Sequence, residues 1–274
     1  MSQRQRAETF KALHAGPEMF VIPNPWDGAS AKLLASMGFK ALTTTSAGLA
    51  FVLGKPDGGV TRQQSLWNAK LIVDSVDVPV AADLENGFGH RPEDAAETIR
   101  QAADVGLVGG SIEDATGNPA DPIYEFNHAV ERVAAAAEAA HALDFPFAFV
   151  ARAEGFLHGK RDLDEIIRRL QAFEKAGADV LFAPGLPDIA AIRTVVQSVG
   201  KPVNVVRGGP GPSLAEVADA GVRRVSLGGS LSRVALTALQ KAAEELLGPG
   251  TFGWSQGILS TDAVNRLMVG RSGS

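Results

Sequence analysis

Short apolar segments alternate with longer stretches of helical periodicity along almost the whole chain. Apolar and β-branched residues dominate the short segments, as is typical of strands buried on both faces. Such strands are expected at residues 19–22, 41–45, 78–83, 110–113, 147–151, 179–183, 202–206 and 224–227. Helices are expected at about residues 27–37, 61–75, 92–105, 123–142, 162–176, 187–199, 213–220 and 230–247. Each predicted strand is therefore followed by a predicted helix.

Eight consecutive strand–helix units predict an α/β fold, the (β/α)₈ or TIM barrel. We expect one domain over residues 1–274, with the barrel at about 18–247 and a C-terminal helical tail at about 251–274. An extra N-terminal helix is expected at about 3–14. A doubly wound open sheet is the alternative, but no G-x-G-x-x-G motif opens a helix after the first strand.

The tail is too apolar to extend freely into water. Its large apolar residues are Phe252, Trp254, Ile258, Leu259, Leu267 and Met268. We therefore expect the tail to pack on the barrel or on a neighbouring subunit.

Carboxylates stand at the ends of the third and fourth predicted strands. Asp83 and Glu85 are two residues apart, so both would point to one side if strand geometry continues to Glu85. Glu113 ends the neighbouring strand, about 5 Å away by standard strand spacing. Close carboxylates raise one another's pKa unless a cation lies between them, and an all-oxygen ligand set favours Mg²⁺ or Mn²⁺. Solvated loop acids are the alternative for each residue alone.

Other polar groups at strand ends could bind a substrate. Asp57 lies between proline and glycine, a context that also suits an ordinary turn. Arg152 ends the fifth strand and could clamp a carboxylate or simply balance the acids. Asn204 lies at the end of the seventh strand. Small residues whose backbone amides could hold a carboxylate, or form a plain turn, follow the second strand: Ser46, Ala47 and Gly48.

Composition narrows the possible functions. The chain has 26 basic and 31 acidic residues, a net charge of -5, and no basic run of the kind that binds nucleic acid. No apolar stretch approaches the roughly 20 residues that cross a membrane. The N-terminus lacks the apolar segment of a secretory signal, so we expect a cytoplasmic protein with no membrane partner. No cysteine is present, which excludes disulfides and cysteine acids or nucleophiles.

The histidines offer weaker candidates. His14, His128 and His141 fall on predicted helices or their flanks and are expected at the surface. His90 and His158 follow strand-end loops, where a site residue is possible but an ordinary loop position is the stronger interpretation.

Several short motifs, in order, resemble the phosphoenolpyruvate mutase/isocitrate lyase superfamily. They are PWDGASA (25–31), SAG (46–48), PDG (56–58), DLENGFG (83–89), IED (112–114) and ARAE (151–154). The fourth is a form of the D-x-D-x-G-x-G motif of that family. The resemblance extends from about residue 10 to residue 250.

The resemblance implies a Mg²⁺-dependent enzyme that acts on a small 2-oxo or 2-hydroxy acid. It implies that the metal is reached, directly or through water, by Asp83, Glu85 and Glu113. It further implies that backbone amides bind a substrate carboxylate and that an arginine contacts substrate, at Ser46, Ala47, Gly48 and Arg152. Members of the family are commonly tetramers of paired barrels that exchange a C-terminal helix, so a homo-oligomer, a dimer or tetramer, is expected.

Departures from the family pattern separate its reactions. The isocitrate and methylisocitrate lyases use a cysteine acid/base in a K-[KR]-C-G-H loop, and this chain has no cysteine. The loop at 115–122 contains Asn118 but no lysine, unlike that of the mutases. Glu85 replaces the usual second aspartate. These departures leave the branch that resembles the oxaloacetate decarboxylases.

We therefore predict a carbon–carbon lyase that decarboxylates oxaloacetate to pyruvate through an enolate, which Asp57 or water would protonate. The alternatives are C–P chemistry on phosphonopyruvate or phosphoenolpyruvate, by a mutase or hydrolase, and a 2-methylisocitrate lyase-like activity without the usual cysteine. A phosphate-binding barrel that uses the glycine pairs at 208–209 and 228–229 is a further reading. That reading leaves the three strand-end acids unexplained.

Overall fold

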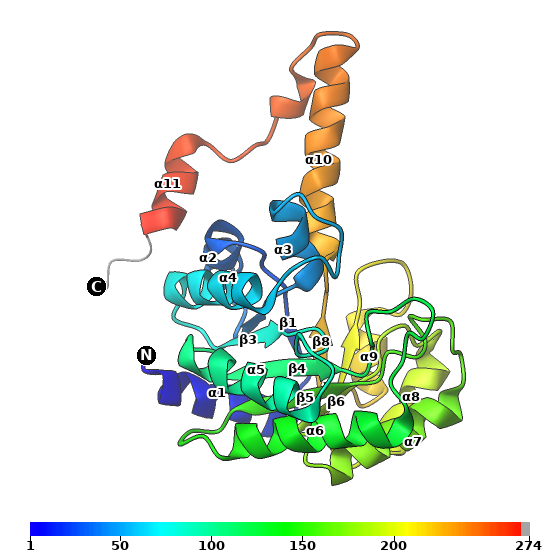
Figure 1. The fold of residues 1–274 in the computed structure, drawn as a ribbon. Coiled ribbons are helices and arrows are strands. Elements are labelled where there is room, and N and C mark those ends of the chain that lie inside the picture. Colours follow the sequence, from blue (N-terminus) through cyan, green and yellow to red (C-terminus); the bar gives the residue numbers. More distant parts are fainter. Residues whose placement is uncertain (270–274) are drawn as a thin grey trace.

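Eight parallel strands form a nearly closed barrel in the computed structural model of the chain, which describes residues 1–269 (Figure 1). The sheet order is β1-β8-β7-β6-β5-β4-β3-β2. A hydrogen bond of 3.1 Å from the Thr43 amide to the Pro23 carbonyl joins the two ends of the sheet. The strands are β1 (Phe20–Ile22), β2 (Leu42–Thr43), β3 (Val80–Asp83), β4 (Gly109–Glu113), β5 (Ala148–Arg152), β6 (Val180–Phe182), β7 (Val203–Val206) and β8 (Arg224–Ser226). The predicted (β/α)₈ barrel is confirmed.

Helices follow the strands and cover the outside of the barrel. Most begin at a side chain that accepts a hydrogen bond from the first helical turn, such as Asp27, Thr61 and Asp188. The helices before the long C-terminal one are α1 (Gln3–Ala15), α2 (Gly28–Ser36), α3 (Ser46–Val52), α4 (Arg62–Ser75), α5 (Pro92–Asp104), α6 (Phe126–His141), α7 (Leu163–Lys175), α8 (Ile189–Gln197) and α9 (Leu214–Asp219). Helix α3 was not predicted, because its glycine-flanked sequence suits a loop equally well.

Helix α1 closes the amino end of the barrel. Phe10 is fully buried and packs with Phe20 and Ile22 of β1. Gly109, at the start of β4, makes room for this ring, because a Cβ atom there would lie 2.8 Å from Cε1 of Phe10. The side chains of this cluster therefore fill the centre of the amino end of the barrel.

His14 lies buried under α1, and the prediction that it is a surface residue is wrong. It shares one helix face with Ala7 and Phe10, and that face turns toward the barrel. Its Nδ1 lies 2.9 Å from the Phe10 carbonyl and its Nε2 lies 3.5 Å from Nη1 of Arg224. Burial, with the charge of Arg224 adding to it, lowers the pKa of His14 from 6.5 to about 3, so the imidazole is neutral.

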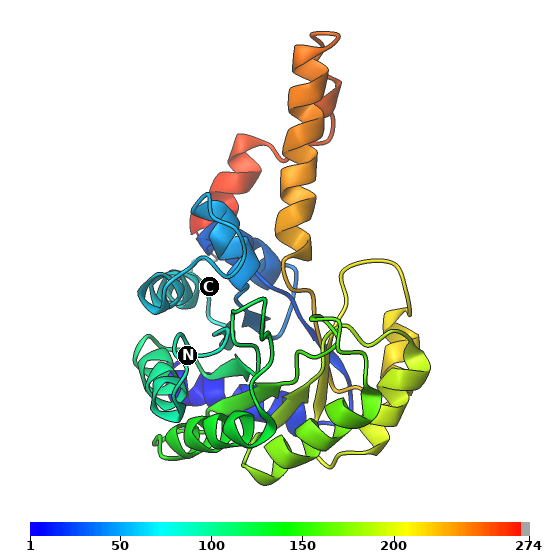
Figure 2. The same cartoon turned by 45° about the vertical axis from the view of Figure 1, so that its right-hand side comes forward.

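The long helix α10 (Ser230–Leu247) leaves the barrel and projects away from it (Figures 1 and 2). Ser232 is its buried residue, near the end that meets the barrel. Large apolar side chains along the rest of the helix are exposed: Val234, Leu236, Leu239, Leu246 and Leu247. This helix therefore does not cover β8 as the other helices cover their strands.

The tail after α10 returns toward the barrel. A 3₁₀ turn, η1 (Gly253–Ser255), precedes α11 (Thr261–Val269), which packs against α2. The Lys32 ammonium donates to the Met268 carbonyl there. Phe252, Ile258 and Leu259 are exposed, so packing on the barrel is found for α11 and not for the segment before it. Residues 270–274 of the predicted tail lie outside the described residues. None of the helices within 1–269 is long and apolar enough to cross a membrane.

Candidate active site

Asp83 is the last residue of β3, at the carboxyl end of the barrel. Its backbone amide donates to the hydroxyl of Thr44 (3.1 Å). One carboxylate oxygen accepts from the hydroxyl of Ser46 (3.0 Å), and the other lies 2.8 Å from Nη1 of Arg152. Asp83 therefore links the start of α3 to the end of β5.

Glu85 comes near Asp83 through a turn and not through strand geometry. β3 stops at Asp83. Glu85 has a φ of 48°, in the left-handed region that residues other than glycine rarely adopt. Phe88, with a φ of 57°, is a second such residue in this loop. The assumption that the strand continues to Glu85 is wrong, and the loop itself positions the second carboxylate.

Arg152 is the centre of the charged cluster. Its guanidinium lies 2.8 Å from Asp83, 3.3 Å from Glu113 and 2.8 Å from Glu154. The guanidinium also lies over the ring of Phe182, 4.9 Å from its centroid. β3, β4 and β5 are neighbours in the sheet, which is why carboxylates at the ends of three strands reach one arginine.

The acids are poorly compensated by this single arginine. Burial, and next the charge of Asp83, raise the pKa of Asp57 above its ordinary value, and the same two causes raise the pKa of Glu85 to about 7. Burial also raises the pKa of Glu113 well above 4.5, against the opposing effect of Arg152. Burial alone would lower the pKa of Arg152, but the surrounding acids raise it. The cluster therefore contains more acidic groups than its single arginine can compensate.

A divalent cation fits the chemistry of these donors. Oε1 of Glu85 is buried and has no hydrogen-bond partner within residues 1–269. Such an oxygen is costly unless a donor or cation reaches it. No three acidic or histidine side chains of the described chain enclose an ion as they stand, and Arg152 lies between Asp83 and Glu113. Mg²⁺ usually takes only one or two protein carboxylates and completes its shell with water and substrate oxygens.

A cavity of about 1190 Å³ opens above the cluster. The predicted residues that line it are Ser46, Asp57, Glu85, Glu113 and Arg152. Asp83 lies beside the cavity, bonded to two of its lining residues. Five of the predicted site residues thus line one cavity. The sixth, Asp83, bonds to two of them, Ser46 and Arg152.

Gly48 and Asn204 are not brought to the cavity. The Gly48 amide donates to the Thr45 hydroxyl (3.2 Å), and a Cβ at Gly48 would lie 2.5 Å from Cγ2 of Thr45. Ala47 lies with Ser46 in the first turn of α3, where backbone amides lack helical acceptors. Asn204 is fully buried and is bonded at both ends of its amide, to Arg224 and Ser226. Its contacts are structural.

Further residues line the same cavity without having been predicted as site residues. Glu154 is almost fully buried, and its carboxylate accepts from Nε of Arg152 (2.9 Å). Its position in the ARAE motif was the signal available in the sequence. His90 and His158, considered weak candidates, both line the cavity, together with the half-exposed side chain of Leu157.

Arg132 of α6 holds the loop after β3 in place. It is buried and donates to the carbonyls of Gly89 (2.9 Å), Arg91 (3.2 Å) and Asn86. Its guanidinium also lies 4.5 Å from the ring centroid of Tyr124. An arginine that satisfies three loop carbonyls stabilises the unusual backbone that carries Glu85.

A second buried arginine supports the end of β5. Asp114 accepts from Arg169 (3.1 Å) and from the backbone amide of Glu154 (2.8 Å). Burial raises the pKa of Asp114 to about 6, and these two donors oppose that rise. The pair fixes the backbone that presents Glu154 to Arg152.

A comparison with known protein families identifies the family of this chain. The model of the family described as phosphoenolpyruvate phosphomutase matches residues 10–247. The chain belongs to this family. It is thereby a member of the phosphoenolpyruvate mutase/isocitrate lyase superfamily, as its motifs predicted.

Relatives in this family catalyse different reactions. A crystal structure of a candidate lyase/mutase from Burkholderia cenocepacia J2315 has a TM-score of 0.94 and 53% identity, over 96% of this chain and 95% of that one. The 2-methylisocitrate lyase of Escherichia coli is 28% identical over 211 residues, 74% of this chain and 70% of that protein. The oxaloacetate decarboxylase of Ectopseudomonas mendocina is 27% identical over 212 residues, 75% and 71% of the two chains. The family therefore supports a lyase or mutase and leaves the substrate open.

Proposed function

We propose that this protein is a Mg²⁺-dependent carbon–carbon lyase that decarboxylates oxaloacetate to pyruvate. The observation that carries the proposal is the cluster of buried acids around Arg152 at the carboxyl end of a barrel of this family. Enzymes with this fold place their active sites at that end. The absence of cysteine from the chain favours a reaction that needs no cysteine acid.

Asp83, Glu85 and Glu113 are the residues that would hold the cation, directly or through water. When bound, Mg²⁺, or Mn²⁺ in its place, supplies positive charge that stabilises the oxygen of a 2-oxo acid as it becomes negative. Glu85 contributes an oxygen that lacks any other partner within the described residues.

The residues of the chain bind and orient the substrate. Arg152 provides donors for a substrate oxygen, and the hydroxyl of Ser46 lines the same cavity. The backbone amide of Ala47, in the first turn of α3, would bind a substrate carboxylate. In the reaction the bond from C3 to the departing carboxylate breaks, its electron pair forms the enolate, and CO₂ leaves. No proton is transferred in this step.

Asp57 is the proposed proton donor for the second step. The enolate must gain one proton at C3 to give pyruvate. Asp57 lines the cavity, and its pKa is raised by burial and by Asp83, which favours the protonated acid that such a step needs. Water is the alternative donor.

One observation favours a second candidate function. Cleavage of 2-methylisocitrate requires an acid for the leaving carbanion. Two imidazoles, His90 and His158, line the cavity and could supply it in place of cysteine. The C–P reactions are less favoured, because the loop at 115–122 offers no cation to a migrating phosphoryl group.

The proposed enzyme is a cytoplasmic homo-oligomer, a dimer or tetramer. The support for assembly is α10, whose exposed apolar residues include Val234 and Leu239, at 64% and 66% exposure. Light scattering should give a multiple of the 28.6 kDa chain. A monomer at micromolar concentration would refute the assembly, and deletion of residues 251–274 should weaken it if the tail lies between subunits.

A parallel turnover assay tests the reaction. Purified protein with Mg²⁺ is given oxaloacetate, 2-methylisocitrate or phosphonopyruvate, and each rate is corrected for the metal-only background. We expect oxaloacetate to be turned over fastest. Faster turnover of 2-methylisocitrate would overturn the proposal, and loss of that activity in His90→Gln or His158→Gln would then identify the acid.

A further inference from the structure

A second cavity, of about 590 Å³, lies at the opposite end of the barrel from the proposed active site. It is formed between α1 and the amino ends of β5, β6 and β7, where Ala148, Val180 and Pro202 lie. The two cavities share no lining residue. The amino end of a TIM barrel ordinarily serves stability, so an open cavity there calls for its own explanation.

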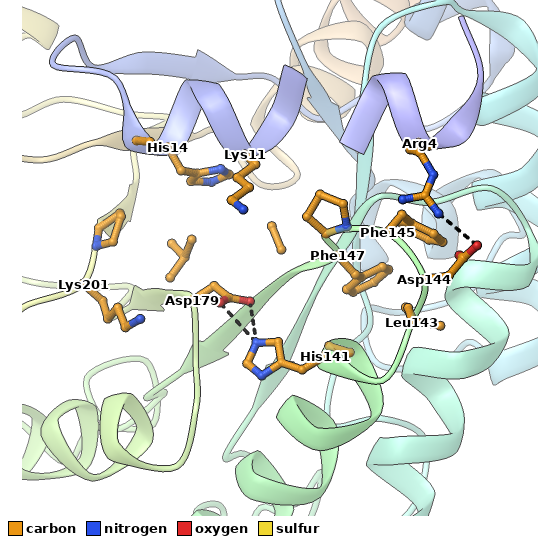
Figure 3. Close-up of a pocket in the computed structure, with 16 residues that line it drawn as sticks. Arg4, Lys11, His14, His141, Leu143, Asp144, Phe145, Phe147, Asp179 and Lys201 are labelled. Carbon is orange, nitrogen blue, oxygen red and sulfur yellow. Dashed lines mark hydrogen bonds and ion pairs between the residues drawn. The ribbon is translucent and has the colours of Figure 1, made fainter. Parts of the chain in front are cut away.

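The wall of this cavity is largely apolar. Figure 3 shows Phe145 and Phe147 side by side on one side of it, with Leu143 next to them. Small residues line other parts of it, among them Ala15 and Ala140, where larger side chains would fill the space. A concave apolar wall with a few polar groups is typical of small-molecule sites.

Two lysines supply uncompensated positive charge. The side chains of Lys11 and Lys201 line the cavity, and neither has an acidic partner within 4.0 Å in the described part of the chain. Figure 3 shows the ammonium group of Lys11 reaching from α1 into the cavity. Arg4 is already paired with Asp144 at 3.0 Å, and the Asp179 carboxylate lies 3.2 Å from Nε2 of His141.

The charge of the cavity differs in sign from that of the chain. Lysine and arginine side chains outnumber carboxylates here by three to two, whereas the whole chain has a net charge of -5. His14 adds no charge, because its burial keeps it neutral. A local positive excess beside an apolar wall complements an anion with an apolar body.

We propose that this cavity binds a small organic anion, a carboxylate on an aryl or branched-alkyl body. The carboxylate would pair with Lys11 or Lys201, and the hydrocarbon part would lie against Phe145 and Phe147. The inference is independent of the reaction at the other end of the barrel, since none of these residues contributes to that site.

Titration calorimetry of the full chain with 1-naphthoate tests the proposal. We expect saturable binding of one molecule per chain, with a dissociation constant of about 0.1–1 mM for a ligand of this size. The double variant Lys11→Met with Lys201→Met should weaken binding about tenfold, whereas Lys40→Met, which changes an exposed lysine outside the cavity, should not. Neutral 1-naphthalenemethanol should bind more weakly than 1-naphthoate.

A second variant separates this cavity from other binding surfaces. Ala15 is exposed at the end of α1, so Ala15→Trp should fold and block the cavity, while Asp83→Ala should bind 1-naphthoate normally. The proposal would be overturned if wild type shows no saturable binding of 1-naphthoate below about 5 mM. It would also be overturned if the double-lysine variant and Ala15→Trp bind 1-naphthoate as tightly as wild type does. Loss of binding in Asp83→Ala would likewise overturn it, because it would place the ligand at the other end.

Discussion

The two ends of this barrel differ in the groups that they bury. At the carboxyl end, Asp83, Glu113 and Glu154 converge on Arg152, and the pKa of Glu113 is raised well above its ordinary value. At the amino end, Phe10 fills the barrel and His14 is held neutral, with a pKa of about 3. Burial favours the neutral form of the titratable group at both ends, but only the carboxyl end gathers several acids around one arginine.

The amino end also shows what a buried charge does without an acid beside it. Burial, with repulsion from Arg152 adding to it, lowers the pKa of Arg224 to about 9. Its partners, Asn204 and His14, are neutral acceptors. Burying the charged cluster at the carboxyl end costs free energy. A role in binding or catalysis therefore explains this cluster better than a contribution to stability does.

Replacement of Arg152 should have the largest effect. Arg152→Met leaves three carboxylates without their shared cation, so we expect the free energy of unfolding to fall by about 3–5 kcal/mol at pH 8. Turnover of oxaloacetate should fall at least about 100-fold, because a substrate-binding charge is lost. Urea unfolding and steady-state kinetics measure the two effects.

Arg168→Met is the matched control for Arg152→Met. Arg168 lies on α7, is 67% exposed and pairs with Glu165. Its loss should cost less than about 1 kcal/mol and leave turnover unchanged. Equal stability of Arg152→Met and wild type would show that the acids do not depend on Arg152.

Replacement of Phe10 should separate stability from activity. Phe10→Ala empties the amino end of the barrel and should lower the free energy of unfolding by about 3–5 kcal/mol. The turnover number per folded molecule should stay within about twofold of wild type, because Phe10 contacts no residue of the catalytic cavity. Met37→Ala, at a residue that is 68% exposed, provides the control. A large loss of turnover would mean that the two ends are coupled.

His14 should make the folded state sensitive to acid. The folded protein resists protonating His14 until about pH 3, whereas the unfolded chain protonates it near 6.5. The burial of His14 therefore leaves the free energy of unfolding unchanged above pH 6.5. Below pH 6.5 it lowers the free energy of unfolding progressively, by about 2 kcal/mol at pH 5. His14→Gln keeps an acceptor for Arg224 and should lose less stability than wild type between pH 7 and pH 5. Parallel urea curves at the two pH values measure this, and an identical pH dependence would contradict the assigned burial.

The fold was predictable because strands and helices alternate regularly and the strands are buried on both faces. The acids were predictable as a group because parallel strands end at one edge of the sheet. Glu85 was placed correctly for a wrong reason, since its position depends on a left-handed turn held by Arg132, far along the sequence.

The positions of Asn204 and His14 differ from those expected from the sequence, and the two differences share a physical cause. Asn204 was expected to bind substrate from its place at a strand end, but side chains inside a barrel are stacked in layers, and Asn204 pairs with Arg224 within them. His14 was assigned to the surface because a helix before the barrel was not expected to plug it. Contacts between residues far apart in the sequence decided both positions.

The most direct test of the proposed Mg²⁺-dependent reaction is pyruvate formation from oxaloacetate by wild type and Asp83→Ala, with Mg²⁺ titrated into metal-free protein. Asp83 joins Ser46 to Arg152 and is proposed to reach the cation. We expect wild-type turnover to depend on Mg²⁺ and to exceed the metal-only rate. Asp83→Ala should turn over oxaloacetate at least about 1000-fold more slowly and should show no measurable Mg²⁺ binding. Equal Mg²⁺ affinity and equal Mg²⁺-stimulated turnover in the two proteins would contradict the proposal.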